Sequence, residues 1–423
     1  MKYQRKAKRF SAKILNIIPF LFSALIFFSQ CMFFHSYADD EMDSDDIDEI
    51  RKMINESIND TSEPCMTKAP SIDAHSAIVM DMESGRVLFE KNAYIKRPMA
   101  STTKIMTAIV AIENGKLDDI VEVSERAASI WGSKIHLKKG QKISLKELLY
   151  GLMLRSGNDA AIAIAEHIGG SEEKFLEMMN NKAREIGALN TNFKTPHGLD
   201  AEGHYSTAYD LAIITRYALK NPLFSSIVST RTAYVNGRSV NNTNEMLSIY
   251  KGADGVKTGF TGQAGRCLVA SATRAGVRYI SVVLNCSTRA KRAMSSKMIL
   301  DYAFNNYSRH NLAEKDEIVA EVNVVKGLKG RVSIKTCDSL VLPLTQSELS
   351  ELQKNIYLPD KLRAPVSKGQ IVGKIEYVST GKILGSVFLE TAEEDPDKDF
   401  MYYLRYIFMM WIRTVKEGIW IEQ

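Results

Sequence analysis

Ser101 and Lys104 lie three residues apart in an apolar stretch, ASTTKIMTAIVAIENGK, whose pattern predicts a helix that starts at Pro98 and stops before Gly115. Residues three apart on a helix share one face, so the hydroxyl and the amine come within hydrogen-bonding reach. Burial favours the neutral amine, which is then a base able to take the serine proton. Free N–H groups at a helix N-terminus also suit a developing oxyanion. The spacing therefore predicts a nucleophilic serine with a lysine base.

Two further polar groups have residue types that suit the same chemistry. Ser156 and Asn158, in LRSGNDAA, fall in a turn between two apolar helices, which is a candidate edge of a cleft. In GVKTGF, we expect Lys257, Thr258 and Gly259 on a strand, where the glycine lets a substrate backbone approach closely.

The specificity of the pattern comes from its three parts together. The S-x-x-K spacing alone is weak, because Ser171 and Lys174 repeat it, and we assign that pair to a helix N-cap and to solvent. K-T-G occurs once in the chain. S-x-x-K, S-x-N and K-T-G in this order form the signature of penicillin-recognising serine enzymes.

The sequence resembles the D-alanyl-D-alanine carboxypeptidases, the low-molecular-mass penicillin-binding proteins of bacterial cell-wall metabolism. The resemblance extends beyond the motifs to GLMLRSGNDAAIAIAEHIGGS, TPHGLD, STAYDLA and GVKTGFTGQAGRCLVASATR. It implies an α+β fold, in which a β-lactamase/transpeptidase-like domain packs helices on an antiparallel sheet and holds the active site between them. A small all-β domain and a C-terminal amphipathic helix follow.

The resemblance also implies roles in catalysis. Ser101 is the acylated nucleophile, Lys104 is its base, and Ser156 relays a proton toward the leaving D-alanine. Acylation releases the terminal D-alanine of a peptidoglycan stem peptide that ends in D-Ala-D-Ala, and hydrolysis of the acyl-enzyme follows. β-Lactam antibiotics would trap the acyl-enzyme as covalent inhibitors. The family needs no metal and no cofactor.

The remaining motif residues are implied to bind the substrate. Asn158 binds the peptide amide, Lys257 and Thr258 receive the terminal carboxylate, and Gly259 allows close approach. The backbone N–H groups of Ser101 and Phe260 form the oxyanion hole. Some relatives have histidine in place of Phe260, so we expect an altered substrate contact and intact chemistry.

Three rival functions can be compared with this one. A serine β-lactamase shares the motifs, but a C-terminal β domain and a membrane tail would have no explanation in such an enzyme. A zinc peptidase is suggested by His197, Asp200 and His204, but their spacing does not match the H-E-x-x-H motif of zinc peptidases. A catalytically silent, membrane-anchored wall-binding protein would not need all the polar motif residues.

The charge balance argues against a nucleic-acid partner. The six charged residues in residues 1–38 are all basic, and 55 basic residues less these six leave 49 against 50 acidic ones, a net charge of −1. The N-terminal segment has a basic start, an apolar run and small residues at Ser36 and Ala38, which predicts a signal peptide cleaved after Ala38. An uncleaved membrane anchor is the alternative.

Composition divides the chain into five segments. We expect the signal peptide at 1–38, an acidic linker at 39–69, the catalytic domain at 70–311, a β-rich domain at 312–392 and an amphipathic helix at 393–423. Within the catalytic domain, a hairpin comes first, helices follow and strands come last. This order predicts that the first and last strands meet in one antiparallel sheet.

The last segment, DFMYYLRYIFMMWIRTVKEGIW, is apolar but is interrupted by Arg405 and Arg413. On a helical wheel these arginines share a stripe with Lys398 and Lys416, which suits a helix lying in a membrane interface better than one crossing the membrane. Docking of this helix on the protein's own core is the alternative. With the signal peptide, the pattern places the protein on the outer face of the cytoplasmic membrane, on the periplasmic or cell-wall side.

Two cysteines, Cys267 and Cys286, fall in neighbouring strand-like runs. They could pair in an oxidising compartment, although two buried thiols are the simpler interpretation.

Overall fold

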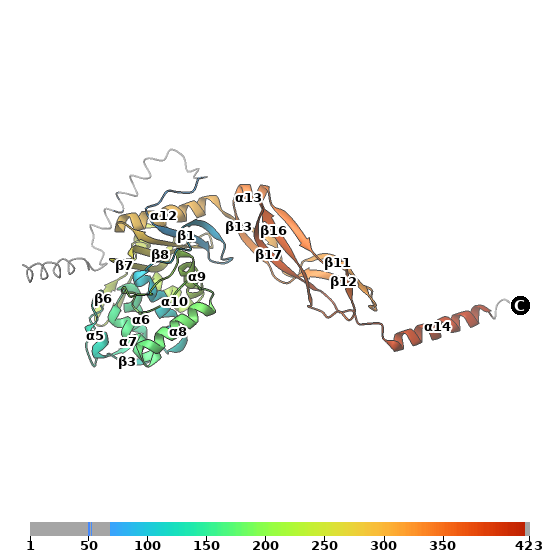
Figure 1. Ribbon diagram of the computed structural model, residues 1–423, viewed down its shortest axis with the longest axis horizontal. Coiled ribbons are helices and arrows are strands. Elements are labelled where there is room, and N and C mark those ends of the chain that lie inside the picture. The colour runs from blue at the N-terminus through green and yellow to red at the C-terminus, as the bar shows by residue number, and fades with distance from the viewer. Residues whose placement is uncertain (1–49, 51, 53–67, 419–423) are drawn as a thin grey trace, which may run out of the picture. The chain divides into compact units, whose positions relative to one another are not determined.

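The computed structural model describes residues 50, 52 and 68–418, and the chain forms two compact units, one ending at Ala303 and the other beginning at Phe304 (Figure 1). The predicted signal peptide and nearly all of the acidic linker lie outside the described residues.

The first unit is built on a five-stranded antiparallel sheet with the strand order β2-β1-β9-β8-β7. The strands are β2 (Val87–Lys91), β1 (Ser76–Asp81), β9 (Val277–Cys286), β8 (Gly265–Arg274) and β7 (Ala253–Thr261). The N-terminal hairpin therefore pairs with the C-terminal strands, as predicted. All six residues of β1 are buried, because helices cover both faces of the sheet.

Helix α12 covers one face of this sheet and the other helices lie on the opposite side (Figure 1). The longer helices are α4 (Lys104–Asn114), α6 (Leu145–Leu154), α7 (Asn158–Gly169), α8 (Glu172–Glu185), α9 (Ala208–Leu219), α10 (Pro222–Ser229) and α12 (Arg289–Asn306), and the short ones are α5 (Glu125–Ser129) and α11 (Met246–Ile249). Several starts are fixed by capping side chains, including Ser171, whose Oγ accepts the N–H of Lys174 as predicted. Two small hairpins complete the unit: β3 (Ile120–Glu122) with β4 (Lys142–Ser144), and β5 (Thr232–Val235) with β6 (Arg238–Asn241).

The predicted start of the first long helix at Pro98 is wrong. Residues Ala100–Thr103 form a 3-10 turn, η1, and the α-helix starts only at Lys104. Ala100 has φ +48°, and the Thr103 hydroxyl donates to its carbonyl at 2.8 Å. Ser101 therefore lies in a tight turn just before the N-terminus of α4. Gly115 ends that helix, as predicted.

The second unit is β-rich, as predicted. Its six-stranded sheet has the order β14-β16-β17-β12-β11-β15, and β10 pairs separately with β13. The strands are β10 (Ser308–Ala313), β11 (Ile318–Val325), β12 (Arg331–Thr336), β13 (Leu340–Leu344), β14 (Gln353–Tyr357), β15 (Lys361–Arg363), β16 (Ile371–Ser379) and β17 (Lys382–Thr391), with the short helix α13 (Gln346–Ser350) between β13 and β14.

The last described element is α14 (Phe400–Gly418). None of its residues with a described side chain is buried. Within the described part of the chain, no helix combines the length and apolarity needed to cross a bilayer.

Candidate active site

The Lys104 amine is the centre of the site. Its Nζ lies 2.8 Å from Ser101 Oγ, 2.8 Å from Asn158 Oδ1 and 2.6 Å from the carbonyl oxygen of His197, and the side chain is fully buried. A neutral amine has two N–H donors and one lone pair. Donation to the two oxygens leaves the lone pair to accept the hydroxyl proton of Ser101. The contacts thus match the needs of a general base.

The electrostatics of the site favour this neutral state. Burial lowers the pKa of Lys104 well below its usual value, and the nearby cation of Lys257 lowers the pKa further, while the carboxylate of Asp159 opposes them. Lys257 itself is 1 % exposed and its Nζ donates to the carbonyl oxygen of Thr258 at 3.0 Å. A second lysine thus lies close enough to the base to disfavour its protonated form.

The S-x-N residues lie where α6 ends and α7 begins. Ser156 is buried and has φ +60°, and Asn158 is the first residue of α7. The Nδ2 of Asn158 donates to the carbonyl oxygen of Trp131 at 2.8 Å, so its Oδ1 is turned toward Lys104. Asn158 thus holds the base in place, a contact that the sequence did not predict.

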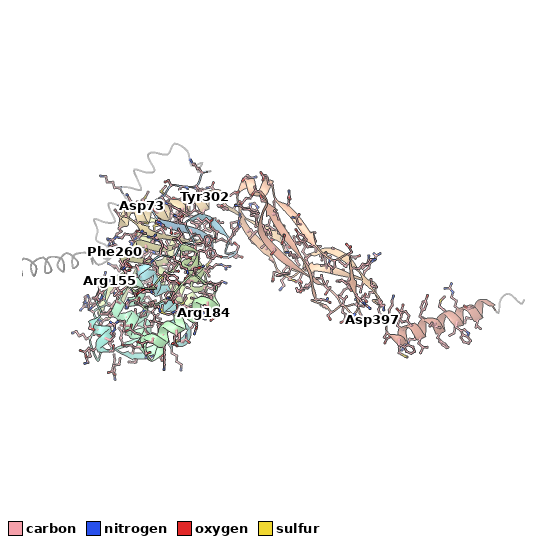
Figure 2. The ribbon with its side chains drawn as sticks, viewed as in Figure 1. Asp73, Arg155, Arg184, Phe260, Tyr302 and Asp397 are labelled. Atoms are coloured by element: carbon pink, nitrogen blue, oxygen red, sulfur yellow. The ribbon has the colours of Figure 1, made fainter. Side chains whose placement is uncertain are left out.

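The K-T-G residues lie on β7, which runs against the 3-10 turn of Ser101. A Cβ built on Gly259 would be 2.9 Å from the backbone nitrogen of Ser101 and 3.1 Å from Ala100 Cβ. Glycine is needed here because strand and nucleophile turn approach this closely. Phe260 follows, half-buried, with the Arg266 guanidinium 3.9 Å from its ring centroid. Phe260 and Arg155, labelled in Figure 2, lie on the same side of the first unit in that view.

We expect Gly259→Ala to lower kcat/KM for reactions at Ser101 about 10- to 100-fold, because a displacement of one ångström at a nucleophile has effects of that size. The matched control is Gly262→Ala in the turn after β7, where an added Cβ meets nothing within 4 Å. Thermal unfolding of both variants separates misplacement from unfolding. Equal activity of the two folded variants would contradict the prediction.

Several contacts of the site were not foreseen from the sequence. The carbonyl of His197 accepts from Lys104, and Gly198 beside it has φ +90°, with its built Cβ only 2.1 Å from the Ala100 oxygen. Thr243 Oγ1 lies 2.9 Å from Thr258 Oγ1. The role of a backbone carbonyl cannot be predicted from residue types, and the sequence analysis used the stretch TPHGLD only as part of the family resemblance.

The three residues that suggested a zinc peptidase, His197, Asp200 and His204, make separate contacts. His204 Nδ1 accepts the N–H of Lys194 at 3.0 Å, so its Nε2 carries the proton and donates to Thr103 Oγ1 at 2.9 Å. Burial lowers the pKa of His204 to about 4, and that of His197 to about 2. Asp200 accepts instead from the Thr261 hydroxyl at 2.7 Å. Among the described residues, no group of three or more His, Cys, Asp or Glu side chains is arranged to hold a metal ion.

The two strand cysteines, Cys267 and Cys286, are buried thiols that are not joined by a disulfide, and burial raises the pKa of Cys286 to about 12. The Cys286 thiol is therefore protonated at neutral pH and is not a reactive thiolate.

Comparison with known proteins agrees with this geometry. Residues 63–288 match the family described as D-alanyl-D-alanine carboxypeptidase, peptidase S11, and residues 307–397 match the C-terminal domain of penicillin-binding protein 5. The chain is 37 % identical to D-alanyl-D-alanine carboxypeptidase DacF of Bacillus subtilis, covering 81 % of this chain and 90 % of that protein. It is 34 % identical to DacA of Escherichia coli K12, covering 81 % and 89 %.

Among solved structures, penicillin-binding protein 5 from Haemophilus influenzae superimposes with a TM-score of 0.72 at 33 % identity, covering 78 % of this chain and all of that one. The match spans both units rather than the catalytic motifs alone. The chain combines a serine bonded to a fully buried lysine beside a K-T-G strand with this likeness along most of its length, and so the protein belongs to the D-alanyl-D-alanine carboxypeptidase family and is a serine-type D-Ala-D-Ala carboxypeptidase of the low-molecular-mass penicillin-binding group.

Proposed function

We propose that Ser101 is the residue acylated by peptidoglycan stem peptides ending in D-Ala-D-Ala, with Lys104 as its general base. The observation that supports this assignment is the 2.8 Å contact between Lys104 Nζ and Ser101 Oγ, made by an amine that is fully buried and surrounded by acceptors. Lys104 takes the hydroxyl proton as Oγ attacks the carbonyl carbon of the penultimate D-alanine.

The other motif residues then receive parts of the substrate. Lys257 and Thr258 bind the terminal carboxylate, and the Asn158 amide binds the peptide. Negative charge on the tetrahedral oxygen is held by the backbone N–H groups of Ser101 and Phe260. Ser156 passes the proton to the leaving amine as the C–N bond breaks. Water then attacks the ester by the reverse route, regenerating the Ser101 hydroxyl and releasing the shortened peptide.

The direct test is incubation of the purified protein with a pentapeptide ending in D-Ala-D-Ala. We expect one equivalent of free D-alanine per peptide, and a covalent adduct with a labelled penicillin that blocks the release. Adduct without D-alanine release or hydrolysis would favour a silent penicillin binder. Rapid turnover of the penicillin itself would favour a β-lactamase.

We further propose that the protein works on the outer face of the cytoplasmic membrane and contacts the lipid surface through α14. Support comes from the predicted signal segment and from the pattern of α14. Its rings and aliphatic side chains are exposed, including Phe408 at 58 % and Trp411 at 62 %, while Arg405 and Arg413 lie on one stripe. Exposed apolar side chains beside a basic stripe suit an interfacial helix on anionic lipid.

Replacing Arg405 and Arg413 with glutamate should reduce binding to anionic vesicles at least about tenfold, since each basic residue near such a surface contributes about 1 kcal/mol. Co-sedimentation with vesicles of phosphatidylglycerol and phosphatidylcholine measures this, and a chain ending at Asp397 should not bind. Hydrolysis of a soluble pentapeptide should be unchanged in both variants. Undiminished sedimentation of the chain ending at Asp397 would disprove the role of α14.

A further inference from the structure

The first turn of α7 carries a buried carboxylate to which the proposed mechanism assigns no step. Asp159 directly follows Asn158, and its side chain is fully buried. Its oxygens accept the backbone N–H of Ile135, at 3.1 Å to each oxygen, and that of Leu137 at 3.0 Å. These partners are N–H donors, as an ionised carboxylate requires. Asp159 therefore fixes the loop of residues 131–137 against the start of α7.

The same 131–137 loop also holds Asn158. The backbone N–H of Asn158 donates to the carbonyl oxygen of Ser133 at 2.7 Å, and its Nδ2 donates to that of Trp131 at 2.8 Å. Gly132 lies between these two residues, and a Cβ built on it would be 2.7 Å from Asn158 Nδ2. Because the loop and the amide are in such close contact, the position of the amide depends on the path of the loop.

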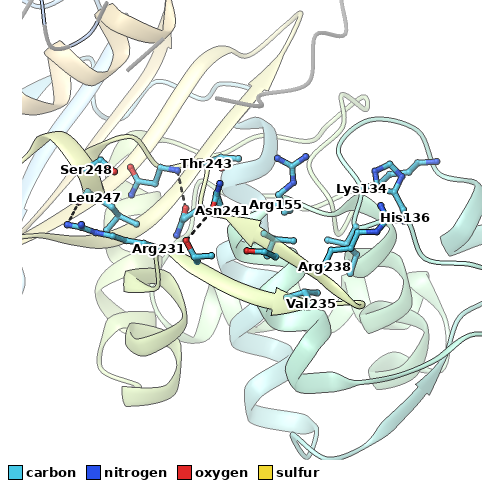
Figure 3. A pocket seen from close by; sticks show the side chains of 16 residues that line it. Lys134, His136, Arg155, Arg231, Val235, Arg238, Asn241, Thr243, Leu247 and Ser248 are labelled. Atoms are coloured by element: carbon cyan, nitrogen blue, oxygen red, sulfur yellow. Dashed lines mark hydrogen bonds between the residues drawn. The ribbon is translucent and has the colours of Figure 1, made fainter. Parts of the chain in front are cut away.

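Asn158 in turn holds the amine of Lys104, whose Nζ lies 2.8 Å from Asn158 Oδ1. The contacts form a continuous chain, in which the Asp159 carboxylate fixes the loop, the loop fixes the amide and the amide fixes the amine. Lys134 and His136 of the loop lie at one end of the cavity shown in Figure 3, whereas this chain of contacts runs through backbone groups of the loop. A displacement of one ångström at a catalytic group can cost about 100-fold in rate.

Asp159 also adds a charge beside the amine. Two charged side chains act on the pKa of Lys104: Lys257 of β7 lowers it and Asp159 of α7 raises it. His197 and His204, from the segment between α8 and α9, are the other titratable groups near the amine. Burial lowers the pKa of His197 to about 2 and that of His204 to about 4, so both rings are neutral at neutral pH. The charges of Lys257 and Asp159 thus oppose each other at the proposed base.

We propose that Asp159 is a positioning residue for the base: its carboxylate holds the Lys104 amine in place through the 131–137 loop and Asn158, and its charge determines how acidic the solution must become before that amine is protonated. This role rests on the function proposed above, because it presupposes that Lys104 takes the proton of Ser101. An acid in the first turn also stabilises a helix N-terminus. That effect alone would change stability and leave the pH dependence of acylation unaltered.

The test is Asp159→Asn, which keeps the shape of the side chain, removes its charge and turns an amide NH₂ toward backbone donors. We expect the second-order rate constant for acylation by a chromogenic penicillin to fall about tenfold on the plateau of its pH profile, because the amine is less well placed. The acid limb of the profile should move to lower pH, since removal of the carboxylate lowers the pKa of Lys104. Stopped-flow acylation across the pH range measures both effects.

Asp210→Asn is the matched control. Asp210 is another buried carboxylate in the first turn of a helix, α9, and it accepts the backbone N–H of Asn190 at 2.6 Å and the hydroxyl of Thr191 at 2.8 Å. This variant should lower the midpoint of thermal unfolding and leave the acid limb in place. Asp159→Ser repeats the loss of charge with a smaller side chain whose hydroxyl can still accept an N–H. It keeps the test available if Asp159→Asn does not fold, and it should move the acid limb in the same direction.

Three results would overturn the proposal: an acid limb that stays fixed or moves to higher pH in the folded Asp159 variants, a plateau that keeps its full height, or an equal shift of the limb in Asp210→Asn. Failure of the underlying function is recognised separately through Lys257→Gln. If Lys104 were not the base, that variant would also leave the acid limb in place. A limb that moves in Lys257→Gln but not in the Asp159 variants would count against the role of Asp159 alone.

Discussion

Ser101→Ala is expected to abolish both D-alanine release and covalent labelling by penicillin. The alcohol oxygen is the only atom that forms the bond to the substrate carbonyl in the proposed mechanism, so an alanine leaves no route to an acyl-enzyme. Loss of a serine nucleophile of this kind lowers kcat by about 10⁴-fold or more. Intact-mass measurement after incubation with penicillin should show one adduct on the unmodified chain and none on the variant.

The chain supplies its own matched control in Ser171, which has the same spacing to a lysine. Ser171 caps α8, its Oγ accepting the N–H of Lys174 at 3.3 Å. Ser171→Ala should cost about 0.5–2 kcal/mol of stability, measured by urea unfolding, and leave labelling intact. A stoichiometric adduct on Ser101→Ala would disprove the assignment of the nucleophile.

Many of the helices and strands could be predicted from the spacing of apolar residues and from the Pro, Gly and capping residues at their ends. The stretches around α6, α7, α8, α9 and α12 have apolar residues at helical spacing, and the alternating runs of β7, β8 and β9 predicted one sheet with the N-terminal hairpin. The hairpin of β5 and β6 was not predicted. Its residues are mostly exposed, so they lack the apolar alternation that marks a half-buried strand.

The start of α4 shows where local reasoning fails. Pro98 is a standard first residue of a helix, yet Ala100 adopts φ +48° and the helix begins at Lys104. This turn is fixed by a local hydrogen bond, from the Thr103 hydroxyl to the Ala100 carbonyl, and by a tertiary one, which His204 donates to Thr103. Backbone strain at a nucleophile persists only where surrounding structure fixes it.

The motif residues were found because their types are unusual for their surroundings, as with a lysine on an apolar helix. The other groups around them give no such signal. The His197 carbonyl is a backbone atom, and Thr243 is a common residue in a polar loop. The residues that line the cavity shown in Figure 3 range from Lys134 to Ser248, so no short stretch of the sequence contains them all. Only the folded chain brings them together.

Lys104→Met should lower the rate of acylation by about 10³-fold or more while the protein remains folded. Methionine has similar length but no basic nitrogen, so Ser101 keeps its place and loses its proton acceptor. The variant also leaves Asn158 Oδ1 and the His197 carbonyl without a donor, so thermal unfolding should be measured beside stopped-flow acylation by a chromogenic penicillin. Near-normal acylation by this variant would exclude Lys104 as the base.

The pH dependence of the unmodified enzyme provides an independent test of the same role. A base must be unprotonated, so acylation should fall about tenfold for each pH unit below the pKa of Lys104. That pKa is depressed by burial and then by the Lys257 cation. Lys257→Gln removes one charge that depresses the pKa of Lys104, so it should raise that pKa and move the acid limb of the pH profile to higher pH.

The plateau of the profile will also fall, because Lys257 is assigned to the substrate carboxylate. A binding defect alone, however, changes the height of a profile and leaves its midpoint in place. An acid limb that stays fixed in Lys257→Gln, or moves to lower pH, would mean that another group provides the base.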